Sequence, residues 1–202
     1  MRSVKEILDR GHYRQLAGKV ILEYKFTIMK ENNQNIMNLN NLLDYDARKF
    51  TSAEILLKNS LPGWINVASS IKLKTVLQKY LDFVQQHIQK MEDFYQEEQI
   101  LPISLTNSVM QAFVSEADEK VSYCSDPAIK DACLLASIQA INHFKISNYG
   151  TAAAFANTLG LEKHAAFFHE AEVNEKQVDD RLSQLAEFEI NQKAKTPIEL
   201  TD

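Results

Sequence analysis

The sequence predicts an all-α protein whose body is an antiparallel four-helix bundle, and two observations carry this prediction. Only 5 Gly and 4 Pro occur in 202 residues, too few for the many turns of a β-sandwich or barrel. Apolar residues recur at helical spacing along four stretches of about 20 to 33 residues, each long enough for a bundle helix of about 30 to 50 Å. Since 45% of its residues are hydrophobic, the chain has enough apolar side chains to form a buried core.

The amino-terminal segment is predicted to be a helical arm separate from the bundle. Residues 4–29 follow a helical rhythm interrupted by Gly11 and Gly18, and the Asn-rich stretch 31–35 has no apolar face and indicates a linker. The first thirty residues carry a net charge of +4 and the remainder −9, so the acidic main body disfavours nucleic acid as a partner. We expect residues 1–36 to be an appended basic arm and linker, or a stretch upstream of a true start at Met37.

The first two bundle helices are predicted to begin near Leu39 and after a pair of serines. An apolar stripe follows Leu39, meets Pro62–Gly63, where the helix should loosen, and continues for one more turn. Ser69 and Ser70 are suitable N-caps for the second helix, whose apolar residues recur as far as Tyr95.

The rest of the bundle contains a short crossover helix and two long helices. Thr106 is predicted to cap the short helix, and Asp126–Pro127 to start the third long helix, which ends at Gly160. The fourth runs from Leu161 to about Gln192. We predict that its inward side chains include Phe168, Val178, Leu182, Leu185 and Phe188, and that His164 and His169 lie at the surface. The bundle domain is therefore placed at 37–194, with a frayed tail at 195–202.

Several classes of function are disfavoured by what the sequence lacks. No apolar run exceeds five residues, so we expect neither a membrane span nor a signal peptide, and we expect a cytoplasmic location. Cys124 and Cys133 have no metal-ligand spacing and are interpreted as plain thiols. No phosphate-binding glycine motif occurs, and neither cysteine has a partner suited to hydrolase chemistry.

Two groups of residues resemble one family. The first is Ala53 to Pro62 with Ala68-Ser69-Ser70 and Leu73-Lys74; the second is Asn142-His143-Phe144 leading to Tyr149-Gly150-Thr151-Ala152, then Leu159-Gly160-Leu161, Glu175-Lys176 and Asp179. They resemble the bacterial YciE/YciF-type ferritin-like family from about Leu39 to Gln192. The resemblance implies a ferritin-like fold with the short helix in its crossover, an association with bacterial stress responses and a homodimer, but it does not supply the chemistry.

Ferritin-like sites place carboxylates and imidazoles on facing helices to hold two metal ions. The resemblance supplies six candidate ligands from this chain, which are Glu54, Asp82, His87, His143, Glu172 and Glu175. Other positions where the family carries acids hold different residues here, namely Phe83, Asn142, Lys145, Val173 and Asn174. Each lost carboxylate should weaken metal binding by about two powers of ten.

We therefore expect a vestigial metal site in a non-catalytic, stress-associated or interaction protein that needs no cofactor and contacts neither nucleic acid nor membrane. A single weak metal site, and an enzyme using di-iron or di-manganese for oxygen or peroxide chemistry, remain the alternatives. A third possibility is a buried hydrogen-bond network of Asn142, His143 and Asn148 that needs no metal. Inward-facing Asn142 and Lys145 would contradict the enzyme, and outward-facing ones would favour it.

Overall fold

The structure is a computed structural model that describes residues 36–100 and 105–195. The chain divides into two units, and the one described here begins at Asn38. Residues 1–35 of the predicted arm and 196–202 of the predicted tail lie outside the described residues. Every regular element within the described ranges is helical, which confirms the all-α prediction.

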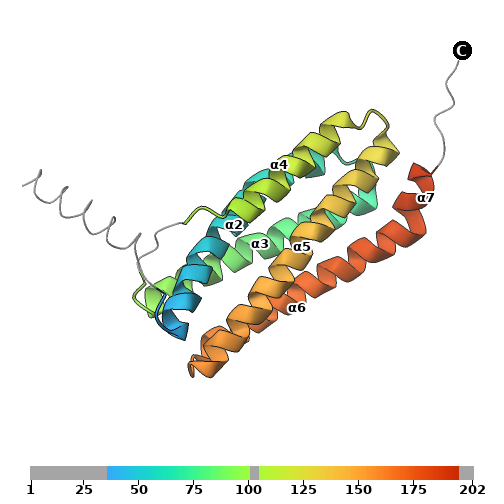
Figure 1. The fold of residues 1–202 in the computed structure, drawn as a ribbon. Coiled ribbons are helices and arrows are strands. Elements are labelled where there is room, and N and C mark those ends of the chain that lie inside the picture. Colours follow the sequence, from blue (N-terminus) through green and yellow to red (C-terminus); the bar gives the residue numbers. More distant parts are fainter. Residues whose placement is uncertain (1–35, 101–104, 196–202) are drawn as a thin grey trace, which may run out of the picture. The chain divides into compact units, whose positions relative to one another are not determined.

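Four long helices form the bundle (Figure 1). They are α2 (Leu39–Val67), α3 (Ile71–Glu97), α5 (Pro127–Thr158) and α6 (Glu162–Leu185). Short connections make α2 and α3, and likewise α5 and α6, antiparallel neighbours, while α3 packs on α6 and α2 on α5. The short helix α4 (Ser108–Tyr123) lies in the connection from α3 to α5 and packs against α2 and α5. This arrangement brings one face of each long helix to a common core.

Side-chain caps fix where the helices start. Ser70 accepts a hydrogen bond from the Leu73 amide at the start of α3, and Asp126 accepts from two amides of α5, as the sequence predicts. The predicted cap of α4 is off by one residue, because Asn107 rather than Thr106 accepts from the Met110 amide at 2.9 Å. Asn107 takes this role because its amide group also donates to the main chain of α2.

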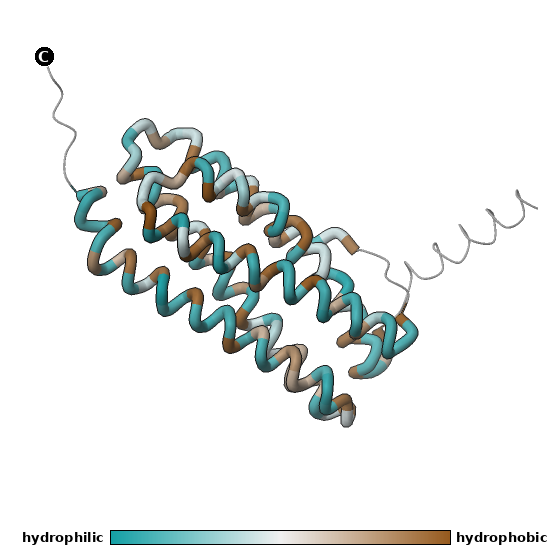
Figure 2. Tube along the Cα trace, turned by 180° about the vertical axis from the view of Figure 1, so that it is seen from behind, coloured by the Kyte–Doolittle hydropathy of each residue, from teal (hydrophilic) through white to brown (hydrophobic). Residues whose placement is uncertain are grey.

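The core runs the length of the bundle. Figure 2 shows hydrophobic and hydrophilic residues alternating along the helices, as expected where one face of each is buried. The aliphatic core includes Leu57, Leu77, Ile138 and Leu182, each with no exposed surface. Burying one such side chain stabilises the fold by about 1.5–3 kcal/mol.

Proline 62 does not end the first helix. α2 continues through it to Val67, since Leu61 and Trp64 on either side are buried, and the Trp64 indole donates to the Asp118 carboxylate of α4 at 2.7 Å. Tertiary packing thus outweighs the missing backbone hydrogen bond, which costs about 3 kcal/mol in a helix interior.

The end of the fourth helix differs from its prediction. After Leu185 the chain forms a π-helical turn, η1 (Ala186–Ile190), followed by α7 (Asn191–Ala194). The wider turn shifts the helical register, so Phe188 is 74% exposed and Ile190 is buried instead. The prediction that Phe188 points inward is therefore wrong.

His164 was also expected at the surface, and this expectation is wrong. Its side chain is buried, its ring lies against Phe94 with centroids 4.8 Å apart, and its Nε2 is 3.0 Å from the Glu98 carboxylate. The contact ties the start of α6 to the end of α3. Sequence spacing within α6 alone does not reveal a partner that comes from another helix.

Candidate metal centre

A cluster of charged side chains lies in the middle of the core, where each long helix contributes one residue. Glu54 comes from α2, His87 from α3, Lys145 from α5 and Glu175 from α6, and we call these four the ionic cluster. Each replaces one apolar residue in a buried stripe spaced by three and four positions; in α2 the stripe is Ala47, Phe50, Glu54, Leu57 and Leu61. The helix geometry that builds the core therefore also brings these four groups together.

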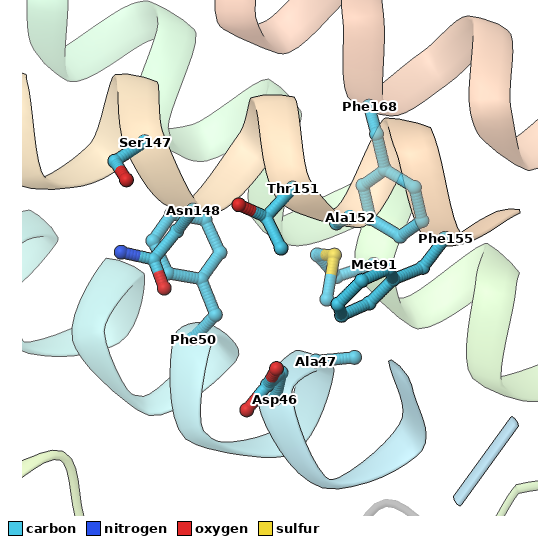
Figure 3. A pocket seen from close by; sticks show the side chains of 10 residues that line it. All are labelled: Asp46, Ala47, Phe50, Met91, Ser147, Asn148, Thr151, Ala152, Phe155 and Phe168. Atoms are coloured by element: carbon cyan, nitrogen blue, oxygen red, sulfur yellow. The ribbon is translucent and has the colours of Figure 1, made fainter. Parts of the chain in front are cut away.

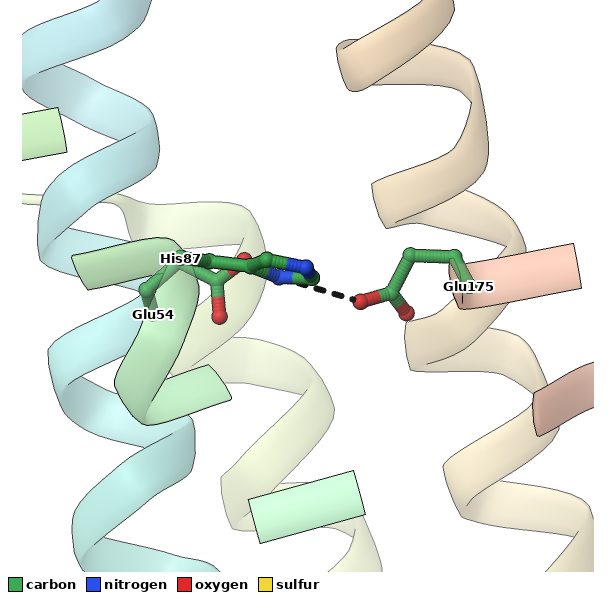
Figure 4. A group of neighbouring side chains, drawn as sticks. All are labelled: Glu54, His87 and Glu175. Atoms are coloured by element: carbon green, nitrogen blue, oxygen red, sulfur yellow. Dashed lines mark ion pairs between the residues drawn. The ribbon is translucent and has the colours of Figure 1, made fainter. Parts of the chain in front are cut away.

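Lys145 lies between the two carboxylates. Its Nζ is 2.6 Å from Glu175 Oε1 and 3.1 Å from Glu54 Oε2, and all three side chains are fully buried. His87 Nδ1 lies 3.6 Å from Glu175 Oε1 and 3.7 Å from Glu54 Oε1. Figure 4 shows the His87 ring between the two carboxylates. Neither ring nitrogen of His87 has a hydrogen-bond partner.

Three further buried side chains surround the ionic cluster. Asn142 donates to Glu175 Oε2 at 2.6 Å and to the main-chain oxygen of the same residue at 3.0 Å. The Tyr149 hydroxyl donates to Glu54 Oε1 at 2.7 Å. The Lys145 ammonium also lies 4.6 Å from the centre of the Tyr80 ring, a cation–π distance. These contacts hold the carboxylates and the ammonium in one arrangement.

The two carboxylates respond to burial in opposite ways. Burial opposes the ionisation of Glu54, but Lys145, His87 and the Tyr149 hydrogen bond outweigh it, so the pKa of Glu54 is lowered. For Glu175, burial dominates, and with the nearby Glu54 charge it raises the pKa despite the attraction of Lys145. The pKa values of Tyr80 and Tyr149 are raised first by burial and then by the carboxylates. Two buried carboxylates sharing one ammonium thus differ in their affinity for a proton.

Glu54, His87 and Glu175 each offer a ligand atom, and these atoms lie within 4.8 Å of one another, so the group could hold a metal ion. The Lys145 ammonium, however, sits against the carboxylate oxygens that a metal would use. A unit charge about 4 Å from another is worth about 4 kcal/mol at an effective dielectric of about 20, so a divalent ion would meet a repulsion of several kcal/mol. The residues present therefore do not fit a two-metal centre.

The structure separates the six candidate ligands into two groups. Glu54, His87 and Glu175 meet in the core, whereas Asp82 is exposed. His143 is largely exposed and lies 3.3 Å from Asp179. Glu172 pairs with Lys176 and His169 at the surface of α6. Each of the three follows directly after a buried residue (Leu81, Asn142 or Ala171), and one helix position turns a side chain about 100° from the core.

The buried network differs in membership from the one considered from the sequence. Asn142 is in it, but His143 is not, and Asn148 is half-buried and donates to a main-chain oxygen of its own helix. Lys145, Tyr149 and Tyr80 complete the network instead. The signal that could have identified them is the stripe spacing, because Asn142, Lys145 and Tyr149 continue the core positions Leu134 and Ile138 of α5 at intervals of three and four.

A cavity nearby does not reach the ionic cluster. It measures about 80 Å³ and is lined in part by Asp46, Phe50, Met91 and Phe155 (Figure 3). None of the four cluster residues is among its lining residues. Since the cluster residues are at most 2% exposed, residues 36–100 and 105–195 leave no open path by which a substrate could reach them.

Fold and site together define a helical bundle with a buried ionic cluster at its centre. The model of the family described as "Domain of unknown function (DUF892)" matches residues 38–195, and the chain belongs to this family. Protein YciF of Escherichia coli K12 is 31% identical over 144 residues, covering 71% of this chain and 87% of that protein. The expected resemblance to YciE/YciF-type proteins is thereby confirmed.

Two solved structures are similar to this one. The E. coli stress protein YciF aligns with a TM-score of 0.73 and 26% identity over 80% of this chain and all of the other. YcfI, described as a putative structural protein from Rhodopseudomonas palustris, aligns with a TM-score of 0.72 and 26% identity. The alignment covers 75% of this chain and 96% of the YcfI chain. Both support the helical bundle.

Proposed function

We propose that this chain is a non-catalytic, ferritin-like stress protein in which a lysine takes the place of the metal. The observation that carries the proposal is Lys145 Nζ lying between Glu54 and Glu175, within 3.1 Å of a carboxylate oxygen of each. The stress association comes from the similarity to YciF, and the structural role is supported by the description of the second similar structure.

The charges in the core support this proposal. A two-metal centre offsets four or more positive charges with several carboxylates, whereas the ionic cluster offers two, and one ammonium already neutralises part of their charge. Asn142 takes a position where related chains tend to carry an acid, and it donates a hydrogen bond to Glu175 instead of offering another charge. Both Asn142 and Lys145 face inward, the orientation that argues against the enzyme.

Metal analysis of protein purified without an affinity metal tests the proposal. We expect less than one tightly bound iron or manganese per chain and weak or no ferroxidase activity, because Lys145 occupies the space between the two carboxylates that an ion would need. The double variant Asn142→Glu, Lys145→Glu should bind iron more tightly than the unmodified protein, as measured by competition with a chelator. The matched control is Lys176→Glu, which changes a lysine paired with the surface residue Glu172 and should leave metal content unchanged.

A single metal ion is the second candidate, favoured by the unpartnered ring nitrogens of His87 and the close approach of three ligand atoms. Stoichiometric metal in the unmodified protein, abolished by Glu54→Ala or His87→Ala, would overturn the lysine-for-metal proposal. Ferroxidase activity in that sample would support the enzyme.

We further propose that the protein is a cytoplasmic homodimer. The family resemblance supports the dimer, and no helix in the described part of the chain has both the length and the apolar character needed to cross a membrane. Light scattering coupled to size exclusion should give twice the 23.1 kDa chain mass. A monomer at micromolar concentration would contradict the dimer.

A further inference from the structure

The contact between Lys145 and Glu175 combines the distance of a short ion pair with complete burial of both side chains. Nζ lies 2.6 Å from Glu175 Oε1 in a site with no exposed surface, yet neither atom makes a contact with the angles of a hydrogen bond. Near-attack geometries hold a nucleophile about 3–3.5 Å from the atom it attacks, and a nitrogen this close to a carboxylate oxygen also lies near the carboxyl carbon.

We propose that Lys145 Nζ and Glu175 Cδ join in an amide bond that cross-links α5 to α6. The inference rests on the proposed function in one respect only, that no metal ion lies between these side chains. No activity of the protein is required, because the bond forms once within each chain.

The surrounding groups supply what the condensation needs. The lysine nitrogen, after giving a proton to Glu54, attacks Cδ of Glu175 and forms a tetrahedral carbon. Glu54 Oε2 lies 3.1 Å from Nζ and is the base within reach, although its lowered pKa makes the transfer uphill, so Glu54 holds the proton only until it leaves with Oε1. Asn142 Nδ2, 2.6 Å from Glu175 Oε2, donates to the oxygen on which negative charge develops.

The step balances without any co-reactant. The C–N bond forms and the Cδ–Oε1 bond breaks. The two protons that the ammonium loses leave with Oε1 as one water molecule, one of them carried by Glu54. Nothing is oxidised or reduced, and the product is a neutral amide in place of a buried ammonium and carboxylate, which removes two charges from the core.

Glu175 rather than Glu54 is the carbonyl partner for two reasons. It is nearer to Nζ, at 2.6 Å against 3.1 Å, and it alone receives the Asn142 side-chain hydrogen bond. Glu54 is held in place by the Tyr149 hydroxyl, which donates to Oε1 and leaves Oε2 facing the lysine. Two similar carboxylates therefore have different roles.

A surface pair in the same helix provides an internal control. Lys176 Nζ lies 2.6 Å from Glu172 Oε1, the same separation as in the buried pair, but the lysine side chain is 54% exposed. Water solvates the lysine there, the Glu172 side chain is itself 17% exposed, and Lys176 pairs with no second carboxylate among the described residues. We expect this pair to remain an ion pair.

Intact-mass measurement of the denatured full-length protein tests the proposal directly. We expect a mass lower than that of the sequence by about 18 Da, one water, and a proteolytic peptide that joins the segments containing Lys145 and Glu175. Glu54→Gln keeps both reacting groups but cannot accept the proton, so its mass should match its own sequence. Lys176→Met should retain the loss of water.

Unmodified protein at the full mass of its sequence would overturn the amide bond, and so would a joined peptide that contains Glu172 and Lys176 only. Both outcomes are measured on the unmodified protein, so they do not depend on whether a variant folds. Full mass without bound metal would leave the proposed function standing, whereas full mass with stoichiometric metal would overturn both proposals.

Discussion

Lys145 is a charged side chain with no exposed surface, and its two carboxylate neighbours are equally buried. Three buried charges are costly to desolvate, so their arrangement stabilises the fold only while all partners remain. We therefore expect the cluster to contribute more to holding the four helices in one register than to net stability.

Replacing Lys145 with Met should lower the free energy of unfolding by about 3–5 kcal/mol, since Glu54 and Glu175 lose the buried side chain that contacts both of them. Urea denaturation followed by circular dichroism measures the change. The control Lys176→Met removes an exposed partner of Glu172 and should cost less than about 1 kcal/mol. Equal effects of the two substitutions would contradict the assignment of Lys145 to the core.

The candidate ligands that the structure brings together are those that lie on a core stripe. Glu54, His87 and Glu175 lie on stripes and meet, whereas His143 and Glu172, chosen by family resemblance, lie one helix position away. The sequence identifies Lys145 as a residue whose orientation separates the enzyme from the non-catalytic protein, but it does not determine that orientation. A lysine normally stays in water, and only the combined carboxylates of two other helices make its burial tolerable.

At the scale of the helix, two glycines should respond in opposite directions to the same substitution. Gly63 is an exposed position inside α2, and an added Cβ would meet nothing within 4 Å, so Gly63→Ala should stabilise the protein by about 0.5–1 kcal/mol. Gly160 has a φ of +74° between α5 and α6, so Gly160→Ala should cost about 1–2 kcal/mol. Thermal unfolding of both variants provides the check, and stabilisation by Gly160→Ala would contradict the left-handed turn.

Glu189 in η1 gives a prediction about acid stability. Its hydrogen bonds with Lys72 and then Lys193 lower its pKa from 4.5 to about 2. Because the folded pKa lies below the unfolded one, the contribution of Glu189 is fully present above pH 4.5 and is lost as the pH falls towards 2. Glu189→Gln should therefore be less stable than the unmodified protein at pH 7, with the difference shrinking between these two pH values. A difference that stays constant across that interval would rule out this linkage.

Helix starts were easier to predict than helix register. Ser70 and Asp126 cap helices through amides two or three residues away, so local sequence contains the whole interaction. The inward orientation predicted for Phe188 is wrong because a single π-helical turn alters the helical register after Leu185. Glu189 in this turn contacts Lys72 and Ser70, which lie far away in the sequence. Continuous helical spacing cannot reveal such a turn.

At the scale of the whole molecule, the bundle is predicted to fold without residues 1–36. The buried core begins at Leu43, and Asn38, which accepts from the Asn41 amide at 2.9 Å, remains in the shortened chain. The melting temperature of the truncated protein should stay within a few degrees of that of the full chain, as followed by calorimetry.

The control for this truncation is Asn38→Ala in the shortened chain, which removes the cap of α2 and should cost about 1 kcal/mol. A truncated protein that does not fold would show that residues 1–36 contribute to the core.

The position of Lys145 has a consequence for how the fold depends on its surroundings. A protein held together by a bound ion gains stability in proportion to the logarithm of the free ion concentration, and it loses that stability when the ion becomes scarce. The Lys145 side chain between Glu54 and Glu175 is part of the chain and is present once in every copy. It cannot be extracted by a chelator or diluted away, so the centre of this bundle should be as well assembled in an iron-starved cell as in an iron-rich one.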